Sequence, residues 1–515
     1  MKLATSAMIS KIDEYSKNKL GISLKSLILK SGSAVARVIR KRAPKNKYVV
    51  ILAGKGNNGA DGYAAAVDIM GEYDVTVYDI FSAGQKGEEG RELIEEFLSL
   101  GGKIVNFEPT AEILTHIRNA GCIVDAVFGT GFHGEMPENI RPLAKAIRES
   151  VEAEKIAIDV PLGINADNGS VSEFAISVGA TVELSFIKPG IISYPARSYV
   201  GDVIYDGLEL PKEEIYKDFT FRYHRIDADW VSNKLPMREA NSNKGTFGKL
   251  LMITGSKKYR GAAHLSLESA LRGGVGLVNF VGSDELTSEL SQKYPEAIYT
   301  KTKEICDYNP EDIEKILELS KAHSATLMGS GSDNTEGLLN LTLALLASEG
   351  GPLILDADAI NALSSLEAEG KEAIKNAKRE VVITPHPLEF ARLCGTEVAF
   401  VQSHRLEVAE KFALDNSCTV VLKGAGTIIT DGKEVYINFA GTSALAKAGS
   451  GDVLAGFVAS FTAQKNTAPK TAAALAVYCH ALAGESLAEE FSSYGVTPSD
   501  LPREIARQIA KFENK

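Results

Sequence analysis

Short hydrophobic runs alternate with longer stretches of mixed polar and apolar residues along the first 210 positions of the chain. The runs have the length and β-branched content of buried strands, and the intervening stretches, such as 87–100 and 139–154, have the length of helices. Alternating strands and helices predict right-handed crossovers and a mostly parallel sheet between two helix layers. The predicted strands are 48–53, 74–79, 103–107, 122–128, 155–160 and 181–186.

The region 209–248 breaks this rhythm, because it is charged and contains Pro211 and Pro236. The alternation then resumes at Lys249, which predicts a second α/β domain in a chain of this length. We expect domains at residues 1–215 and 216–515. The second contains hydrophobic runs at 250–256, 276–282, 325–331, 352–361, 381–387, 419–432 and 434–441, followed by a helix at 449–461.

Composition excludes several classes of protein. The chain has 44% hydrophobic and 24% charged residues, a globular balance, and its net charge of -11 argues against nucleic-acid or anionic-membrane binding. No apolar run is long enough to span a bilayer, and the first residues become charged too early for a signal peptide. The five cysteines are scattered and form no CxxC pair, which predicts a cytoplasmic location without disulfides or a zinc site.

Polar side chains follow three predicted strands of the first domain. The first strand runs into GKGNNGADG, the fourth contains Asp125 and the fifth contains Asp159. Ligands bind at the carboxyl ends of strands in an open parallel sheet, and a buried aspartate is costly unless paired or bound. Asn58, Asp125 and Asp159 are therefore expected to meet at one rim, where their oxygens suit a hard cation. The amides of 129–134 can hold a phosphate.

A structural interpretation of the same residues stays open. Asparagine and aspartate also cap helices and turns, so any one of them alone favours a structural role. Three of them at matching strand ends favour a binding site.

Four motifs, GKGNNGADG, DAVFGTGFHGE, DVPLGINADNG and ATVELSFIKPG, make residues 8–210 resemble the Rossmann-like NAD(P)HX epimerases. That family interconverts the R and S epimers of hydrated NADH and NADPH. The resemblance implies that Asp159 is the acid/base group. It also implies a K+ ion on Asn58, Asp125 and position 162, where Leu162 replaces the usual serine and offers only its backbone carbonyl. The implied substrate contacts are Asn57, Asn58, Gly59, Ala60, Asp61, Gly129, Thr130, Gly131, Phe132, His133, Gly134 and Glu135.

The motif AKAGSGDVLAG at 446–456 is the strongest signal in the second domain. A turn of small residues opens a helix whose backbone amides can bind phosphate at close approach. Asp452 lies in the first turn, where it can accept a proton from a hydroxyl that attacks the phosphate. The alternative is a helix-capping aspartate, which would contribute ~1 kcal/mol to stability.

Residues 225–510 resemble the ribokinase-like fold, and within it the ADP/ATP-dependent NAD(P)HX dehydratases. The resemblance rests on KLLMITGSKKYRGAAHL, TLMGSGSD, LILDADAINAL, VVITPHPLEFARL, VVLKGAGTIITDG and AKAGSGDVLAG. It implies that Asp452, as catalytic base, and Ala262, Gly331 and His386 contact NAD(P)HX. The implied nucleotide-binding residues are Lys423, Gly424, Ala425, Gly426, Thr427, Gly449, Ser450 and Gly451. Phosphoryl transfer also implies Mg²⁺, although no acidic magnesium motif is evident.

Together the two resemblances predict a cytoplasmic, homo-oligomeric repair enzyme. It would epimerise NAD(P)HX and dehydrate the S epimer with ADP, or alternatively ATP, as co-substrate. One alternative is a ribokinase-like kinase for a vitamin precursor or a sugar. Another is that the first domain is a non-catalytic binding module.

Overall fold

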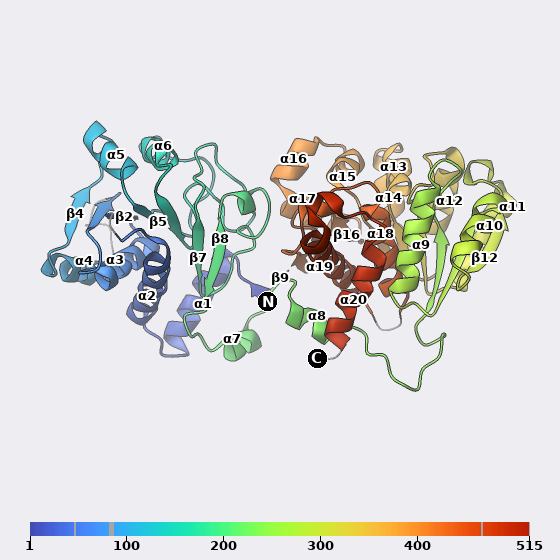
Figure 1. Ribbon diagram of the computed structural model, residues 1–515, viewed down its shortest axis with the longest axis horizontal. Coiled ribbons are helices and arrows are strands. Elements are labelled where there is room, and N and C mark those ends of the chain that lie inside the picture. Colours follow the sequence, from blue (N-terminus) through green and yellow to red (C-terminus); the bar gives the residue numbers. More distant parts are fainter. Residues whose placement is uncertain (46–47, 82–86, 465–466, 514–515) are drawn as a thin grey trace. The chain divides into compact units, whose positions relative to one another are not determined.

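The computed structural model describes residues 1–45, 48–81, 87–464 and 467–513, which form two compact units (Figure 1). The N-terminal unit comprises residues 2–223, and the C-terminal unit comprises Met1 with residues 224–515. The boundary expected at 215/216 falls inside the short helix α7 (Lys212–Asp218), which belongs to the N-terminal unit.

The sheet of the N-terminal unit is parallel, in the order β4-β3-β2-β5-β6-β7-β8. The chain enters at β2 in the middle, adds β3 and β4 on one side, and then adds β5 to β8 on the other. This reversal is the position at which open α/β sheets bind ligands. The strands are β2 (Val49–Ala53), β3 (Val75–Asp79), β4 (Lys103–Asn106), β5 (Cys122–Ala126), β6 (Glu154–Ile158), β7 (Ala180–Leu184) and β8 (Asp202–Asp206).

Helices cover both faces of this sheet (Figure 1). Val49 and Ile51 of β2 pack with α2, α3 and α4, whereas Val50 and Leu52 pack with α5 and α6. Because side chains alternate along a strand, β2 must be hydrophobic throughout. The helices are α1 (Ser6–Asn18), α2 (Leu24–Arg42), α3 (Asn57–Ile69), α4 (Glu88–Ser99), α5 (Ala111–Arg118), α6 (Arg141–Glu149) and α7.

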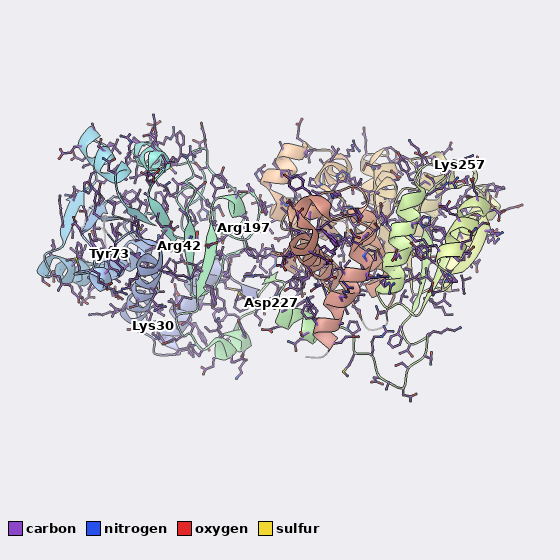
Figure 2. The ribbon with its side chains drawn as sticks, viewed as in Figure 1. Lys30, Arg42, Tyr73, Arg197, Asp227 and Lys257 are labelled. Carbon is purple, nitrogen blue, oxygen red and sulfur yellow. The ribbon has the colours of Figure 1, made fainter. Side chains whose placement is uncertain are left out.

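Arg42, the last residue of α2, ties that helix to the sheet (Figure 2). Its guanidinium donates to Glu154 of β6 at 2.7 Å and to Asp202 of β8 at 2.8 Å. Both carboxylates begin their strands. The ion pairs therefore lie at the amino edge of the sheet, opposite the carboxyl edge where the predicted site residues follow their strands.

The C-terminal unit has a mixed sheet that includes the order β9-β18-β17-β16-β15-β14-β13-β10-β11-β12. The pairs from β12 to β16 are parallel, and β17 and β18 continue the sheet antiparallel. The strands are β9 (Tyr223–Arg225), β10 (Lys249–Ile253), β11 (Leu277–Ser283), β12 (Ile298–Thr302), β13 (Ala325–Met328), β14 (Leu353–Leu355), β15 (Val381–Ile383), β16 (Thr419–Leu422), β17 (Ile428–Thr430) and β18 (Val435–Ile437).

One large hydrophobic cluster joins this sheet to α9, α18, α19 and α20. Leu250, Leu327 and Val421 enter it from three different strands. Among the described residues, no helix is both long enough and apolar enough to cross a membrane. The helices are α8 (Ala228–Lys234), α9 (Arg260–Arg272), α10 (Asp284–Lys293), α11 (Pro310–Lys321), α12 (Glu336–Leu346), α13 (Asp358–Ser364), α14 (Ala368–Lys375), α15 (Pro387–Cys394), α16 (Val398–Ser403), α17 (Arg405–Asp415), α18 (Ser450–Ala463), α19 (Pro469–Gly495) and α20 (Leu501–Glu513).

The hydrophobic runs of both halves correspond to strands, as predicted, but the sequence prediction missed β8, β9 and β12. All three strands lie at or near an edge of their sheet and contain no fully buried residue. A half-exposed strand lacks the continuous hydrophobic run that marks the central strands.

In the turn after β2, the backbone at Gly59 packs closely against the backbone at Gly54. A Cβ on Gly59 would lie 2.0 Å from the carbonyl oxygen of Gly54. We expect Gly59→Ala to lower the free energy of unfolding of the N-terminal unit by about 1–3 kcal/mol, because the turn must open to admit the methyl group. Urea titration followed by circular dichroism measures this.

Gly56→Ala is the matched control. No atom lies within 4 Å of a Cβ on Gly56, and its φ of -93° suits any residue. Equal stability losses in the two variants would contradict the steric argument.

Candidate functional sites

The carboxyl ends of β2, β5 and β6 lie side by side, which brings the predicted polar residues of the N-terminal unit to one rim. Ala53 is in register with Ala126, and Asp125 with Ala157. Asp125 thus lies one position before the end of β5, and Asp159 directly follows β6. The shared rim predicted from the sequence is confirmed.

The side-chain amide of Asn58 has no partner among the residues that the structure describes. It lies in the first turn of α3, and both its Oδ1 and its Nδ2 are buried without a hydrogen bond in the described residues. A buried polar group without a partner costs ~1–3 kcal/mol, so this amide is suited to a ligand. Gly129 packs against it, because a Cβ there would lie 3.3 Å from the Cβ of Asn58.

The neighbours of Asn58 in the turn differ in exposure. Asn57 is exposed, whereas Gly59, Ala60 and Asp61 are buried within α3. Burial, together with the charge of Asp159, raises the pKa of Asp61 well above its usual value. Asp61 therefore belongs to the buried charged groups of this site.

Asp125 is 1% exposed, and its carboxylate accepts two backbone N–H groups. Leu162 donates at 2.6 Å and Val127 at 3.1 Å. Burial raises the pKa of Asp125 to about 7 in spite of these bonds. The carbonyl of Leu162 accepts the amide of Ile176 at 3.0 Å, and its side chain lies in a hydrophobic cluster. Leu162 thus turns its N–H, and not a hydroxyl, toward Asp125.

Asp159 is held by a buried lysine. Its Oδ1 accepts the ammonium of Lys188 at 2.5 Å and the amide of Leu184 at 3.1 Å. Its φ of 65° is in the left-handed region, which an aspartate adopts only where its surroundings enforce it. The side chain of Asp159 is 19% exposed, whereas that of Lys188 is fully buried. The buried lysine therefore fixes the orientation of the Asp159 carboxylate, which stays partly accessible to solvent.

Glu183 completes this buried group. Its Oε2 lies 3.4 Å from the Nζ of Lys188, and its Oε1 is buried without a partner in the described residues. Burial raises the pKa of Glu183 to about 8. Burial alone would lower the pKa of Lys188, but Asp159 and Glu183 raise it overall. Asp13 of α1 faces the same charges, and burial and Asp159 raise its pKa to about 6.

The loop 129–135 is largely exposed, apart from the buried Phe132. Its aromatic ring lies 5.6 Å from that of Phe128, which anchors the loop to the end of β5. His133 pairs with the side chain of Asn165 at 3.0 Å, and the carbonyl of Thr130 accepts the hydroxyl of Ser6 at 3.1 Å. The remaining predicted contacts of this loop, Gly129, Gly131, Gly134 and Glu135, are at least partly open to solvent.

The C-terminal unit places Asp452 in the first turn of α18, after the left-handed Gly449 at φ 102°. Burial raises the pKa of Asp452 to about 7, with Asp356 adding to the shift and Lys423 opposing it. The helix N-terminus and the lysine favour the negative charge that develops in phosphoryl transfer. The carboxyl group of Asp452 can therefore gain or lose a proton near neutral pH.

Lys423 links the two predicted nucleotide-binding segments. Its ammonium donates to Oδ1 of Asp356 at 2.9 Å, and a Cβ on Gly451 would lie 3.4 Å from its Nζ. Asp356 is 1% exposed and also accepts the hydroxyls of Ser330 at 2.8 Å and Thr384 at 2.7 Å. Burial alone would lower the pKa of Lys423, but Asp356 raises it overall.

The turn 424–427 follows directly. Gly424 has a φ of 134° and Gly426 a φ of 63°, both in the region that favours glycine. The hydroxyl of Thr427 closes the turn on the carbonyl of Gly424 at 2.9 Å. Gly424 and Ala425 are exposed, as a binding turn requires, and Ser450 on the other segment is buried.

His386 caps helix α15. Its Nδ1 accepts the amides of Leu388 at 3.1 Å and Glu389 at 3.3 Å, while its own amide donates to Glu389 at 2.8 Å. Its Nε2 lies 3.2 Å from the other oxygen of Glu389. Burial and Lys423 lower the pKa of His386, so the ring is a neutral, oriented group. Burial raises the pKa of Glu389 to about 7.

The structure also brings Ala262 and Gly331 together. Gly331 has a φ of 59°, and a Cβ there would lie 2.5 Å from that of Ala262. A side chain at position 331 would therefore fill the space between Gly331 and the first turn of α9, where Ala262 lies. Among the described residues, no group of three or more His, Cys, Asp or Glu side chains could hold a metal ion.

Comparison with known proteins agrees with this division of the chain. The family model described as NAD(P)H-hydrate dehydratase matches residues 250–507, and the one described as YjeF-related protein N-terminus matches residues 24–190. The bifunctional NAD(P)H-hydrate repair enzyme of Moorella thermoacetica is 31% identical over 97% of this chain and 95% of its own length. The Escherichia coli enzyme of the same description is 31% identical over 95% of this chain and 90% of its own length. The chain belongs to the family of bifunctional NAD(P)H-hydrate repair enzymes.

Solved structures resemble the C-terminal unit of this family member. A ribokinase-like superfamily protein from Enterococcus faecalis is 25% identical, with a TM-score of 0.50 over 58% of this chain and 99% of its own. The ADP/ATP-dependent NAD(P)H-hydrate dehydratase of Bacillus subtilis, co-crystallised with ATP/Mg²⁺, is 30% identical. Its TM-score is 0.49 over 56% of this chain and 98% of its own. The likeness to the Enterococcus faecalis protein confirms the predicted ribokinase-like fold.

Sequence reasoning missed several charged residues at both sites of this repair enzyme. Glu183 lies inside a predicted strand, Lys188 follows it in SFIKPG, and Asp356 and Glu389 lie in motifs that were recognised without a role for these carboxylates. An ionisable residue inside or next to a hydrophobic run was the signal that identified Asp125. Applied throughout the chain, the same rule would have identified Glu183 and Asp356.

Lys188→Met tests the buried charges of the N-terminal unit. The substitution keeps most of the side-chain volume but leaves Asp159 and Glu183 without their cation. We expect the free energy of unfolding to fall by about 3–5 kcal/mol at pH 7, measured by urea titration. Lys145→Met, at an exposed position 3.9 Å from Glu149, is the control and should have little effect. A loss as small as the control's would contradict the pairing.

Proposed function

We infer that the chain repairs hydrated nicotinamide cofactors in two steps. The N-terminal unit interconverts the R and S epimers of NAD(P)HX, and the C-terminal unit dehydrates the S epimer to NAD(P)H. The co-substrate we propose is ADP, which gives AMP and phosphate. The observation that carries the proposal is the position of Asp452, at the N-terminus of α18 beside Lys423, in a chain whose two halves match the two families in order.

In the C-terminal unit, Asp452 takes the proton of the ring hydroxyl as that oxygen attacks the terminal phosphorus of ADP. The amides of 449–451 and the ammonium of Lys423 stabilise the charge on the phosphoryl group. The C–O bond of the phosphorylated hydroxyl then breaks and its electron pair leaves with the phosphate, while the neighbouring ring carbon loses a proton and the double bond of NAD(P)H is restored. Asp356 holds Lys423 in place through this sequence.

We propose that the turn 423–427 and the residues 449–451 bind the nucleotide, and that Ala262, Gly331 and His386 contact NAD(P)HX. The exposed glycine-rich turn and the junction of Ala262 with Gly331 support these roles. Mg²⁺ would screen the phosphate charge. Because the described residues contain no acidic cluster for it, the ion would be held mainly by the nucleotide.

In the N-terminal unit, Asp159 is the proposed acid/base group. Lys188 and the amide of Leu184 fix its Oδ1, which leaves Oδ2 for the substrate. The proposed substrate contacts are residues 57–61 and 129–135, which follow the adjacent strands β2 and β5. The close packing of Gly129 on Asn58 supports a shared surface.

We propose that K+ is held by Asn58 and Asp125. The unpartnered amide of Asn58 and the raised pKa of the buried Asp125 fit a cation with oxygen ligands. Leu162 lacks the family's usual serine hydroxyl, and its carbonyl already accepts Ile176. The ion would supply positive charge beside the cofactor phosphates.

The five cysteines are free thiols in the structure, which supports the proposed cytoplasmic location. The expected lack of nucleic-acid binding is consistent with a net charge of -11, and the homo-oligomer stays a prediction. Light scattering after size exclusion measures the oligomeric state.

The proposed reactions can be followed by the absorbance of NADH. We expect the protein, given mixed NADHX epimers with ADP and Mg²⁺, to convert both epimers to NADH faster than the epimers interconvert spontaneously. The Asp159→Asn variant should convert the S epimer to NADH at the normal rate. It should convert the R epimer only as fast as that epimer interconverts spontaneously. Asparagine is the appropriate replacement, because it also tolerates the left-handed φ of residue 159. A stable phosphorylated product without recovery of NADH would contradict the proposal and favour a kinase.

Dehydration should depend on the protonation of Asp452. A base with a pKa of about 7 is active when deprotonated, so kcat should be constant above that value and fall about tenfold per pH unit well below it. Asp452→Asn should lower kcat by about 10²–10⁴-fold, while epimerisation of the R form continues. A pH-independent kcat between pH 5.5 and 8.5 would exclude Asp452 as the base.

A further inference from the structure

Arg405 is a buried cation beneath the proposed nucleotide turn. It begins α17, is 2% exposed, and donates through Nη2 to the carbonyl oxygens of Leu422 at 3.1 Å and Lys423 at 3.2 Å. Its Nη1 donates to Oε1 of Gln402 at 3.0 Å. A planar guanidinium thus fixes two consecutive peptide groups where β16 ends and the turn begins.

No carboxylate within the described residues forms an ion pair with Arg405, and its Nε is buried without a partner. Burial lowers the pKa of Arg405 to about 10. Lys423 and Lys188, the other cations at the two sites, are paired with aspartates. A buried charge is costly unless something compensates it, so this arginine suggests an anion that arrives from outside the chain.

The position of Arg405 indicates where that anion binds. A Cβ on Gly424 would lie 3.2 Å from Nη1 and 3.3 Å from Nη2, so the guanidinium packs directly against the backbone of the turn. Gly424 and Ala425, on the other side of that backbone, are exposed. An anion on the turn would therefore be separated from the charge of Arg405 by only one layer of backbone.

We propose that Arg405 is a positioning residue for the nucleotide, which holds the 423–427 turn in its binding conformation and whose charge is compensated by a phosphate group of ADP. This inference rests on the proposed nucleotide site. It assigns to Arg405 two effects that can be separated, the orientation of the turn through its carbonyls and the attraction of the anion through its charge. Neither effect places Arg405 in contact with the reacting atoms.

The full-length chain tests this with two substitutions and one matched control. Arg405→Met removes the charge and the hydrogen bonds, whereas Arg405→Lys keeps the charge but cannot reproduce the fork. Arg379→Met is the control, because Arg379 is 8% exposed and also donates to backbone carbonyls, those of Ser348 at 3.1 Å and Glu349 at 2.7 Å, which lie outside the proposed site.

We expect Arg405→Met to raise the Kd for ADP, measured by calorimetry, by at least about tenfold, and to raise the KM for ADP in parallel with kcat changed by less than about threefold. Arg405→Lys should lose less affinity at low salt than Arg405→Met and should show the steeper salt dependence. Arg379→Met should lower Tm and keep the Kd of the wild type. If Arg405→Met does not fold, a Kd for Arg405→Lys raised several-fold above wild type gives the same result.

An unchanged Kd in both Arg405 variants would overturn the inference, and so would equal losses of affinity in Arg405→Met and Arg379→Met, which would indicate a general structural effect. These outcomes differ from a failure of the proposed function. A wild-type chain that neither binds ADP nor restores NADH would refute the nucleotide site itself, whereas a wild type that binds ADP no better than its Arg405 variants refutes only the role of Arg405.

Discussion

A buried lysine paired with an aspartate at the carboxyl edge of a parallel sheet is the interaction on which each candidate site depends. Lys188 holds Asp159 in the N-terminal unit, and Lys423 holds Asp356 in the C-terminal unit. In both cases burial works against the charges, and the partner carboxylates keep the lysine protonated. Removing either member would leave its partner charged and desolvated, so the pairs tie the chemistry of each site to the stability of its unit.

The two ion pairs differ in what they position. The Lys188 pair holds Oδ1 of Asp159, the proposed acid/base group, in a strained backbone conformation. The Lys423 pair does not include Asp452, the proposed base, and instead positions a cation between two glycine-rich turns. In the proposed function the first pair orients a proton carrier, and the second prepares a surface for the transferred phosphate. Arg405 adds a second cation to that surface, separated from it by the backbone of the turn.

The fold could be predicted where strands are fully buried and not where they are half exposed. Strands such as β2 and β5 appear in the sequence as continuous hydrophobic runs, whereas the missed β8, β9 and β12 lie at or near exposed edges. At the sites, motifs identified the residues that follow strands, including Asn58, Asp159 and Asp452. The buried ion pairs at the sites were harder to find, because Lys188 reaches Asp159 across a separation of 29 residues and Lys423 reaches Asp356 across 67. Local sequence carries no signal for such contacts.

Each unit has a hydrophobic core of its own among the described residues. The clusters of the N-terminal unit end at Phe221, and the large cluster of the C-terminal unit begins at Ile226. We expect a substitution that disrupts one core to destabilise that unit first, so that the two activities would be lost at different temperatures. A cell in which only the N-terminal core failed would still recover the S hydrates of its cofactors. The R hydrates would accumulate and be recovered only as fast as they epimerise without catalysis.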